Sequence, residues 1–240
     1  MRQVCNPTIT IPYWASTLEE TLNDPTVSVV WSPEFFGNGY NFVETGPFGN
    51  WTDGTGRRIS RNLNHIGGVL TESDIERVVE RNTHYHDIFM NPRTKDFANT
   101  LEGINYNVHG YVGGTMNRLD RAAYDPVFIF HYAYIDHLFE KARENFRMKG
   151  FNPANDYPNC PGIHDSQAPM ANFTFFRNID GLNDIWTNQY FYYDDVPTCS
   201  ALNRDCGTPY LTCANIDGQW KCQSTVTKYA FYMSPEVPMA

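Results

Sequence analysis

Apolar side chains recur every three or four residues between Thr94 and Gly113, which is the period of an α-helix. The members of this stripe are Phe97, Leu101, Ile104, Val108 and Tyr111. The Gly113-Gly114 pair predicts where the helix ends, because consecutive glycines are poor helix formers. We therefore expect a helix that starts near Thr94 and ends just before this pair.

A second helical pattern opens at Asp125-Pro126 and continues to Lys149. Asp is a good N-cap, and Pro is tolerated in the first turn because its missing N–H has no partner there. Gly150 predicts the end of this helix. Its first half is apolar on nearly every face, as in a buried helix, whereas its second half is charged.

The rest of the chain carries weaker signals. Capping boxes at Ser16–Glu19 and Ser73–Glu76 predict two short helices, the first over residues 17–22. From Trp31 to Asn64 the chain is rich in Gly, Asn, Pro and aromatic residues, which predicts a long ordered loop. We expect a mainly α fold with long irregular loops, in which residues 1–198 form the main domain and residues 199–240 a small Cys-rich tail.

Composition narrows the classes of partner. The 240 residues carry a formal net charge of −9, and the sequence pI is near 5.2. This acidic balance argues against nucleic acid or an anionic membrane surface as the main partner. No run of about eighteen apolar residues occurs, so we expect no transmembrane helix.

The tail contains four of the six cysteines, in a setting rich in Gly, Pro and Asn. They are Cys199, Cys206, Cys213 and Cys222. This spacing predicts a disulfide-stapled module whose connectivity stays open among three pairings. A zinc site is the alternative, but no C-x-x-C knuckle is present. Cys5 and Cys160 remain, and they can pair with each other.

Two acceptor sequons, Asn50-Trp51-Thr52 and Asn172-Phe173-Thr174, accompany these cysteines. Together they fit a secreted, extracellular glycoprotein, although each short pattern also arises by chance. The sequence begins without a signal peptide, so we expect a mature or proteolysed fragment, or a chain with an added Met.

The two predicted helices carry motifs that resemble a known family. They are the Val108-His109…Gly113-Gly114 segment and the D-P-x-F-x-x-H segment from Asp125 to His131. These resemble the copper-B half of tyrosinases and haemocyanins, the type-3 copper family. The resemblance extends from about Pro7 to Cys222, and the T-G-P-F segment and the Cys-rich tail resemble molluscan secreted tyrosinases.

This resemblance implies a four-helix bundle that holds two coppers, each bound by three histidines, and an activity that oxidises phenols and catechols or binds oxygen reversibly. Here the three copper-B positions correspond to Asn105, His109 and Tyr132. An amide or a phenol is a poor replacement for imidazole on copper. The neighbouring His131 is rotated by about 100° from Tyr132 on a helix, so it is no simple substitute. Only eleven residues precede Pro12 of the P-Y-W element, so the copper-A half is not expected in this chain.

Other positions have candidate roles through the resemblance. An acid near Glu102 holds a water beside copper in some members, although without copper Glu102 becomes a hydrogen-bonding core carboxylate. Tyr106 occupies the position after the first ligand, where the family usually has Asn. His84 and His86 form an H-x-H pair that can bind metal, but we favour a surface loop there.

We expect a catalytically inactive, secreted tyrosinase-like protein with a structural or interaction role, in an extracellular matrix or an assembled complex. No cofactor is expected, and His109 is at most a weak metal ligand; copper would return only with the family function. One alternative is a copper phenol or catechol oxidase fragment completed by another chain. The other is a small-molecule binder that reuses the former copper pocket. The residues of that pocket are Glu102, Tyr106, Phe128, His109, His131 and Tyr132.

Half of a four-helix bundle cannot bury its inner face alone, and exposed apolar patches mark interfaces. We therefore expect another chain or a second copy to cover this face, with no nucleic acid or membrane partner. The residues assigned to the face are Ile104, Val108, Phe128 and Ile135.

Overall fold

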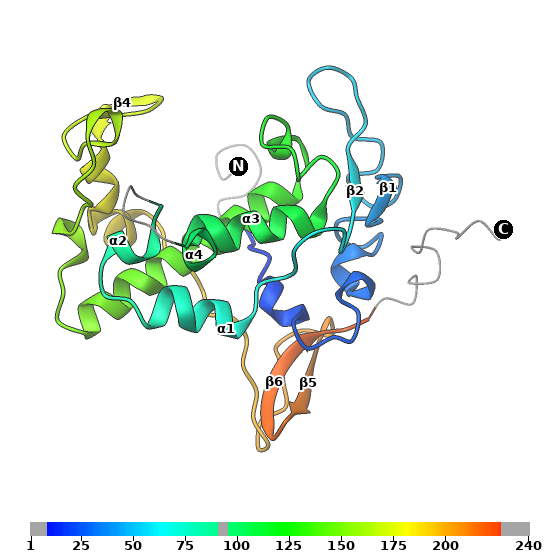
Figure 1. Cartoon of the computed structure of the whole chain (residues 1–240). Helices are drawn as coiled ribbons and strands as arrows, with labels where there is room; N and C mark the ends of the chain where they lie inside the picture. Colours follow the sequence, from blue (N-terminus) through cyan, green and yellow to red (C-terminus); the bar gives the residue numbers. More distant parts are fainter. Residues whose placement is uncertain (1–8, 91–95, 227–240) are drawn as a thin grey trace. The chain divides into compact units, whose positions relative to one another are not determined.

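The structure is a computed structural model that describes residues 9–90 and 96–226 (Figure 1). The chain forms two compact units. The first unit comprises the chain up to Thr71, Tyr106–Tyr134 and the chain from Val196. The second unit comprises Glu72–Asn105 and Ile135–Asp195. The two long helices, α3 and α4, each run from one unit into the other.

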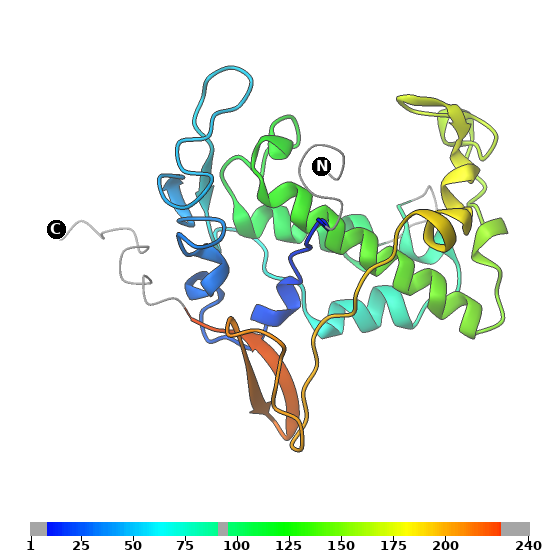
Figure 2. The same ribbon diagram turned by 180° about the vertical axis from the view of Figure 1, so that it is seen from behind.

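Both long helices predicted from the sequence are present. Helix α3 spans Leu101–Val112, and α4 spans Val127–Met148 (Figures 1 and 2). The start of α3 differs from the expected one near Thr94, which lies outside the described residues. Thr100 is extended and its Oγ1 accepts from the Gly103 N–H at 3.0 Å, so this residue caps the helix. A short 3-10 helix, Phe97–Asn99, precedes it.

Asp125 fixes the start of α4 through two contacts. Its Oδ1 accepts from the Val127 N–H at 3.0 Å, the capping bond that the sequence predicts. The same carboxylate receives two hydrogen bonds from the Arg61 guanidinium, each at 2.8 Å, and both side chains are fully buried. Arg61 lies on β2, so this ion pair joins the helix start to a strand of the first unit.

The first unit also contains two of the three antiparallel strand pairs found in the described part of the chain. Strand β1, Tyr40–Phe42, pairs with β2, Ser60–Asn62. Strand β5, Leu211–Ile216, pairs with β6, Gln219–Ser224, through a turn at Asp217-Gly218 in which both residues have positive φ. The short 3-10 helices of this unit are Ser16–Glu19, Pro25–Val27, Val29–Trp31 and Ala122–Tyr124.

Aromatic rings fill the core of the first unit. The Trp14 and Trp31 rings meet edge to face at 5.3 Å, and Phe36 packs against both of them. The chain directly after β6 is joined to the rest of this unit, because the Val29 N–H donates to the Thr225 carbonyl oxygen at 2.8 Å. The predicted boundary at residue 199 stays a prediction.

The second unit is organised around the buried Arg143 of α4. Its guanidinium donates to Glu140 at 2.9 Å, to the Tyr85 hydroxyl at 2.8 Å and to Asp184 at 2.5 Å. The Tyr85 ring also packs edge to face on Phe146 at 5.4 Å. The charged second half of α4 therefore supplies the polar centre of this unit.

Short elements make up the rest of the second unit. Helix α1, Glu72–Ile75, continues into a π-helical turn at Glu76–Glu80, and α2 spans Tyr85–Ile88. Strand β3, Pro169–Met170, pairs with β4, Phe173–Arg177. The remaining turns are the 3-10 helices Pro153–Asn155, Gly162–His164 and Asn178–Leu182 and the π-helical turn Trp186–Tyr190.

The expected mainly α class holds in part, since the described chain is mixed and partly helical. The predicted helix over residues 17–22 is a 3-10 helix, Ser16–Glu19, and the predicted loop from Trp31 to Asn64 contains β1 and β2. The expected exposed apolar face is also wrong in part, because Ile104 and Val108 are 3% and 0% exposed. Among the described residues, no helix has the length and apolar character needed to cross a bilayer.

Candidate functional site

His109 is the buried centre of the site that the sequence singles out. It lies on α3 and is 1% exposed. Its Nδ1 lies 2.7 Å from the Met116 carbonyl oxygen. Because a carbonyl only accepts, Nδ1 carries the proton, and Nε2 is left with a lone pair. Burial lowers the pKa of His109 below its ordinary value, outweighing the Met116 contact, so the imidazole is neutral at physiological pH.

The glycine pair after α3 makes this contact possible. Gly113 and Gly114 have φ values of +66° and +52°. A Cβ at Gly114 would lie 2.2 Å from the Ser60 carbonyl oxygen, and one at Gly113 would lie 2.6 Å from that of Asn62. Only glycine fits this close approach to β2. The chain reverses direction at the two glycines, and this reversal brings the Met116 carbonyl back to His109. The Gly113-Gly114 pair thus ends α3 and also places the Met116 carbonyl that keeps the proton of His109 on Nδ1.

Aromatic side chains of α4 surround the His109 ring. The Tyr132 ring stacks on Phe128 at 4.1 Å, and it lies 5.7 Å from the His109 ring. The His131 ring lies 5.6 Å from that of His109 and 5.7 Å from that of Tyr132. On the side of α4 toward the N-terminal segment, the Trp14 ring lies 6.2 Å from His131. We call His109, Phe128, His131 and Tyr132 the aromatic box.

The His109 Nε2 atom is buried and has no hydrogen-bond partner among the described residues. It is therefore an acceptor enclosed by rings. This arrangement is that of a metal-ligating histidine, in which a backbone carbonyl holds Nδ1–H and presents Nε2.

The other two predicted pocket residues, Tyr106 and Glu102, and the copper-B position Asn105 are not part of the aromatic box. Tyr106 is 47% exposed. Glu102 belongs to the second unit, where its carboxylate accepts from the Met90 N–H at 3.1 Å. Asn105 lies one turn before His109 on α3 and is half-buried. The resemblance groups these residues by family position, and that grouping does not specify which way each side chain faces.

The H-x-H pair takes a structural part in the second unit. His84 Nδ1 lies 2.9 Å from an Asp156 carboxylate oxygen, and its ring stacks on that of His86 at 5.2 Å. Phe151 packs against the His84 ring at 4.7 Å. Within the described ranges, no cluster of three His, Asp, Glu or Cys ligand atoms includes this pair.

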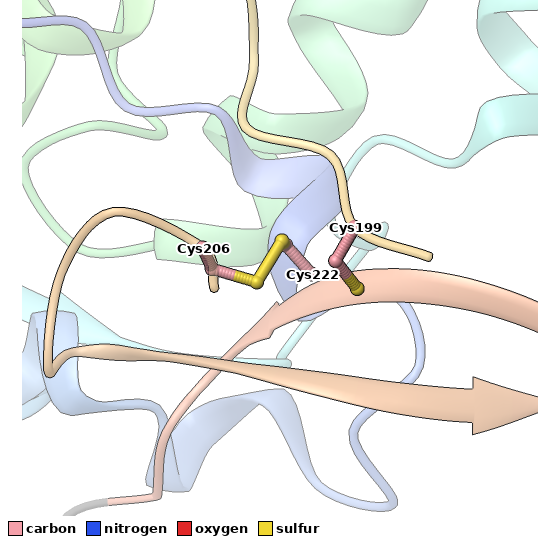
Figure 3. Close-up of side chains that lie close together, drawn as sticks. All are labelled: Cys199, Cys206 and Cys222. Atoms are coloured by element: carbon pink, nitrogen blue, oxygen red, sulfur yellow. A yellow bond between two sulfur atoms is a disulfide. The ribbon is translucent and has the colours of Figure 1, made fainter. Parts of the chain in front are cut away.

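The tail cysteines form two disulfides, Cys199–Cys213 and Cys206–Cys222, which confirms the prediction that the tail is disulfide-bonded. The sulfurs of Cys199, Cys206 and Cys222 lie within 4.8 Å of one another (Figure 3). A zinc site needs thiolates, and disulfide bonds already occupy these sulfurs.

Cys160 forms no disulfide with a described cysteine. Its proposed partner, Cys5, lies outside the described residues.

From the sequence, Glu19 is expected only to cap a helix, but its side chain is completely buried. Its Oε1 accepts from Trp14 Nε1 at 3.0 Å and from Ser28 Oγ at 3.1 Å. Burial raises the pKa of Glu19 to about 8, against smaller opposing contributions from these hydrogen bonds. The hydrophobic pattern of the chain carries no signal for this burial, since a capping box looks the same on a surface helix.

Comparison with known proteins identifies relatives. Residues 1–144 match the family model described as "Tyrosinase: Common central domain of tyrosinase". The chain is 34% identical over 225 residues to a "Tyrosinase-like protein" of Pinctada maxima, covering 85% of this chain and 48% of the relative. The same identity and coverage hold for "Tyrosinase-like protein 2" of Margaritifera margaritifera. A "Putative tyrosinase-like protein tyr-3" of Caenorhabditis elegans is 32% identical over 92% of this chain and 33% of its own length. The chain thus spans about half or less of the length of these relatives.

Proposed function

The chain belongs to the tyrosinase family, and we propose that it is a catalytically inactive member with a structural or interaction role outside the cell. The observation that carries this proposal is the set of side chains at the three copper-B positions. They are an amide, an imidazole and a phenol, at Asn105, His109 and Tyr132. In the family, three imidazoles occupy these positions.

The donor chemistry of these residues does not fit a type-3 copper site. His109 retains the tautomer of a ligand, with Nε2 unprotonated and enclosed. A carboxamide is a poor ligand for copper, and a phenol with an ordinary pKa near 10 must lose a proton to bind. The Tyr132 ring, moreover, stacks on Phe128. We therefore assign no oxygen or phenol chemistry to this chain.

The chief alternative is a phenol or catechol oxidase completed by another chain. A second chain could supply further histidines, but it would leave Asn105 and Tyr132 unchanged. The nearby His131 would have to replace one lost ligand, and its ring does lie 5.6 Å from that of His109. Even then the site would have two imidazoles in place of three.

A small-molecule binder is the second alternative, and one observation favours it. The buried Nε2 of His109 has no hydrogen-bond partner among the described residues, and a hydroxyl or N–H of a ligand would satisfy it. The aromatic box would then supply stacking surfaces. Catechol-like and indole-like probes in an NMR titration would test this alternative through the His109 ring signals.

An extracellular location is part of the proposal, because disulfides persist in oxidising compartments and two are present. We further propose that the chain associates with another protein or with a second copy. Of the apolar helix face expected to meet a partner, Ile104 and Val108 are buried by the chain itself. The interface would therefore use the residues of that face, and of α4 beside it, that stay accessible. Phe128 and Ile135 are half-buried, and Ile129 of α4 is 57% exposed.

The proposal has two direct tests on the purified full chain. Catechol oxidation should stay at the level of the buffer after incubation with copper, and oxidation that scales with bound copper would overturn the inactive assignment. Light scattering coupled to size exclusion should show a dimer or larger species at micromolar concentration. A strictly monomeric chain would rule out self-association and leave only a different partner.

A further inference from the structure

The β3–β4 hairpin of the second unit combines an acceptor sequon with exposed aromatic side chains. Its turn is formed by Ala171 and Asn172, between Pro169–Met170 and Phe173–Arg177. Asn172 adopts a left-handed φ of +64°, which Asn tolerates better than most residues. Figures 1 and 2 show β4 and its turn at the outside of the second unit.

The two sequon side chains of this hairpin are available for chemistry. Asn172 and its neighbours on β4 are exposed. Neither the Asn172 amide nor the Thr174 hydroxyl makes a hydrogen bond with a described residue. An enzyme that modifies the sequon would therefore break no contact of the described fold.

The second sequon differs in this respect. Asn50 is also exposed, with a φ of +66°, but its Oδ1 accepts from Arg58 Nη2 at 3.2 Å. Thr52 pairs with the same Arg58 in an isolated antiparallel bridge. Modification at Asn50 would have to displace this contact. The structure thus distinguishes two motifs that the sequence presents as equivalent.

The phenylalanines of β4 give the hairpin an unusual surface. Phe175 is 97% exposed, Phe173 is 61% exposed and Phe176 is 39% exposed. An isolated pair of strands also leaves unpaired backbone edges, and apolar edge strands pair readily with other chains. Arg177 is the first charge after the Phe173–Phe176 run. Soluble proteins usually cover such an edge or place a bulky polar group beside it.

We propose that Asn172 carries an N-linked glycan, and that this glycan covers the phenyl rings of the β3–β4 hairpin. The inference rests on the extracellular location proposed above. In the reaction, Asn172 Nδ2 loses one proton and forms a bond to the anomeric carbon of an oligosaccharide. The bond between that carbon and the pyrophosphate oxygen of a lipid-linked oligosaccharide donor breaks, the lipid pyrophosphate leaves, and the transferase that catalyses the step takes up the proton, so no oxidant or reductant is required.

The first experiment measures occupancy in the full chain, secreted from insect cells behind a signal sequence. Peptides are treated with an amidase that converts a glycosylated Asn to Asp in ¹⁸O-labelled water, and the mass shift is quantified at each sequon. We expect high occupancy at Asn172 and lower occupancy at Asn50. Unmodified Asn172 in the secreted chain would overturn the proposal.

The second experiment measures shielding. The Thr174→Ala variant removes the sequon at the hairpin, and Thr52→Ala is the matched control at the other sequon. We expect a several-fold rise in binding of a hydrophobic dye, together with greater self-association, for Thr174→Ala alone. Adding Phe175→Ser should reverse both effects.

If Thr174→Ala removes the glycan and leaves dye binding unchanged, the shielding role is wrong. The copper content of the same secreted protein is measured independently, so failure here is distinct from failure of the inactive-tyrosinase proposal.

Discussion

Replacement of the buried Glu19 by Gln should make the stability of the first unit less dependent on pH. The carboxyl is fully buried and its Oε1 accepts from Trp14 and Ser28. Burial raises its pKa in the folded chain to about 8, from an ordinary value of 4.5. Between these two pH values the folded chain binds more protons than the unfolded chain. The free energy of unfolding of the wild type therefore falls as pH rises through this window.

The size of the effect follows from the two pKa values. One pKa unit corresponds to 1.36 kcal/mol. The free energy of unfolding of the wild type should therefore fall by about 5 kcal/mol between pH 4.5 and about 8. In the Glu19→Gln variant, the amide oxygen of the new side chain can accept the same two hydrogen bonds, and the side chain stays neutral at every pH. Glu19→Gln should thus match the wild type near pH 4.5 and exceed its stability by several kcal/mol at pH 8.

The assay is urea unfolding at several pH values between 4.5 and 8.5, followed by tryptophan fluorescence, because Trp14 and Trp31 lie in this core. Glu34→Gln is the matched control, since it removes the same charge from an exposed position of the same unit. The slope of the free energy against urea concentration should stay constant, so that only the midpoint shifts. Parallel pH profiles for the wild type and Glu19→Gln would refute the reasoning.

Two further changes test the site and the helix start. The double variant Asn105→His/Tyr132→His restores imidazoles at the copper-B positions, and it should bind copper stoichiometrically by elemental analysis while neither single variant does; equal copper binding by wild type and double variant would show that these positions do not limit the metal. Arg61→Met leaves Asp125 buried without its cation and should cost about 3–5 kcal/mol in urea unfolding. The double variant Arg61→Met/Asp125→Asn should recover part of that loss, and no recovery would mean that the buried charge of Asp125 is not its cause.

The two long helices were predictable because their boundaries depend on local chemistry. The Gly113-Gly114 pair, the Asp125 cap and Gly150 act within one or two turns of the residues they bound, and α3 and α4 end where these residues predict. The start of α3 was less predictable, since the apolar stripe continues past the Thr100 cap into Phe97. The spacing of apolar residues does not show at which residue a capping side chain starts the helix.

The hairpins show where the prediction was incomplete. Asp217-Gly218 is a strong two-residue hairpin signal, whereas the cysteine spacing around it predicts only a disulfide-bonded module. Glu19 and Arg143 could not have been placed, because each is buried by partners that no local pattern identifies: Ser28 and Trp14 for the acid, and Asp184 and Tyr85 for the base.

For the candidate site, family resemblance placed His109, Phe128 and Tyr132 together, and the structure packs their rings within 6.1 Å of His109. The family resemblance did not reveal the contact with the Met116 carbonyl that keeps the proton of His109 on Nδ1. That contact depends on the reversal at Gly113-Gly114, and a motif alone does not describe such a reversal. Helical rotation alone also underestimated how close the His131 ring lies to His109.

The most direct test of the central claim is the copper content per chain. Purified full chain is incubated with excess copper, dialysed and measured by elemental analysis, with Asn105→His/Tyr132→His as the positive control. We predict a value near zero for the wild type, because the copper-B positions offer a single imidazole in register. Tight binding of one or more coppers per chain, abolished by His109→Ala, would contradict the inactive-tyrosinase proposal.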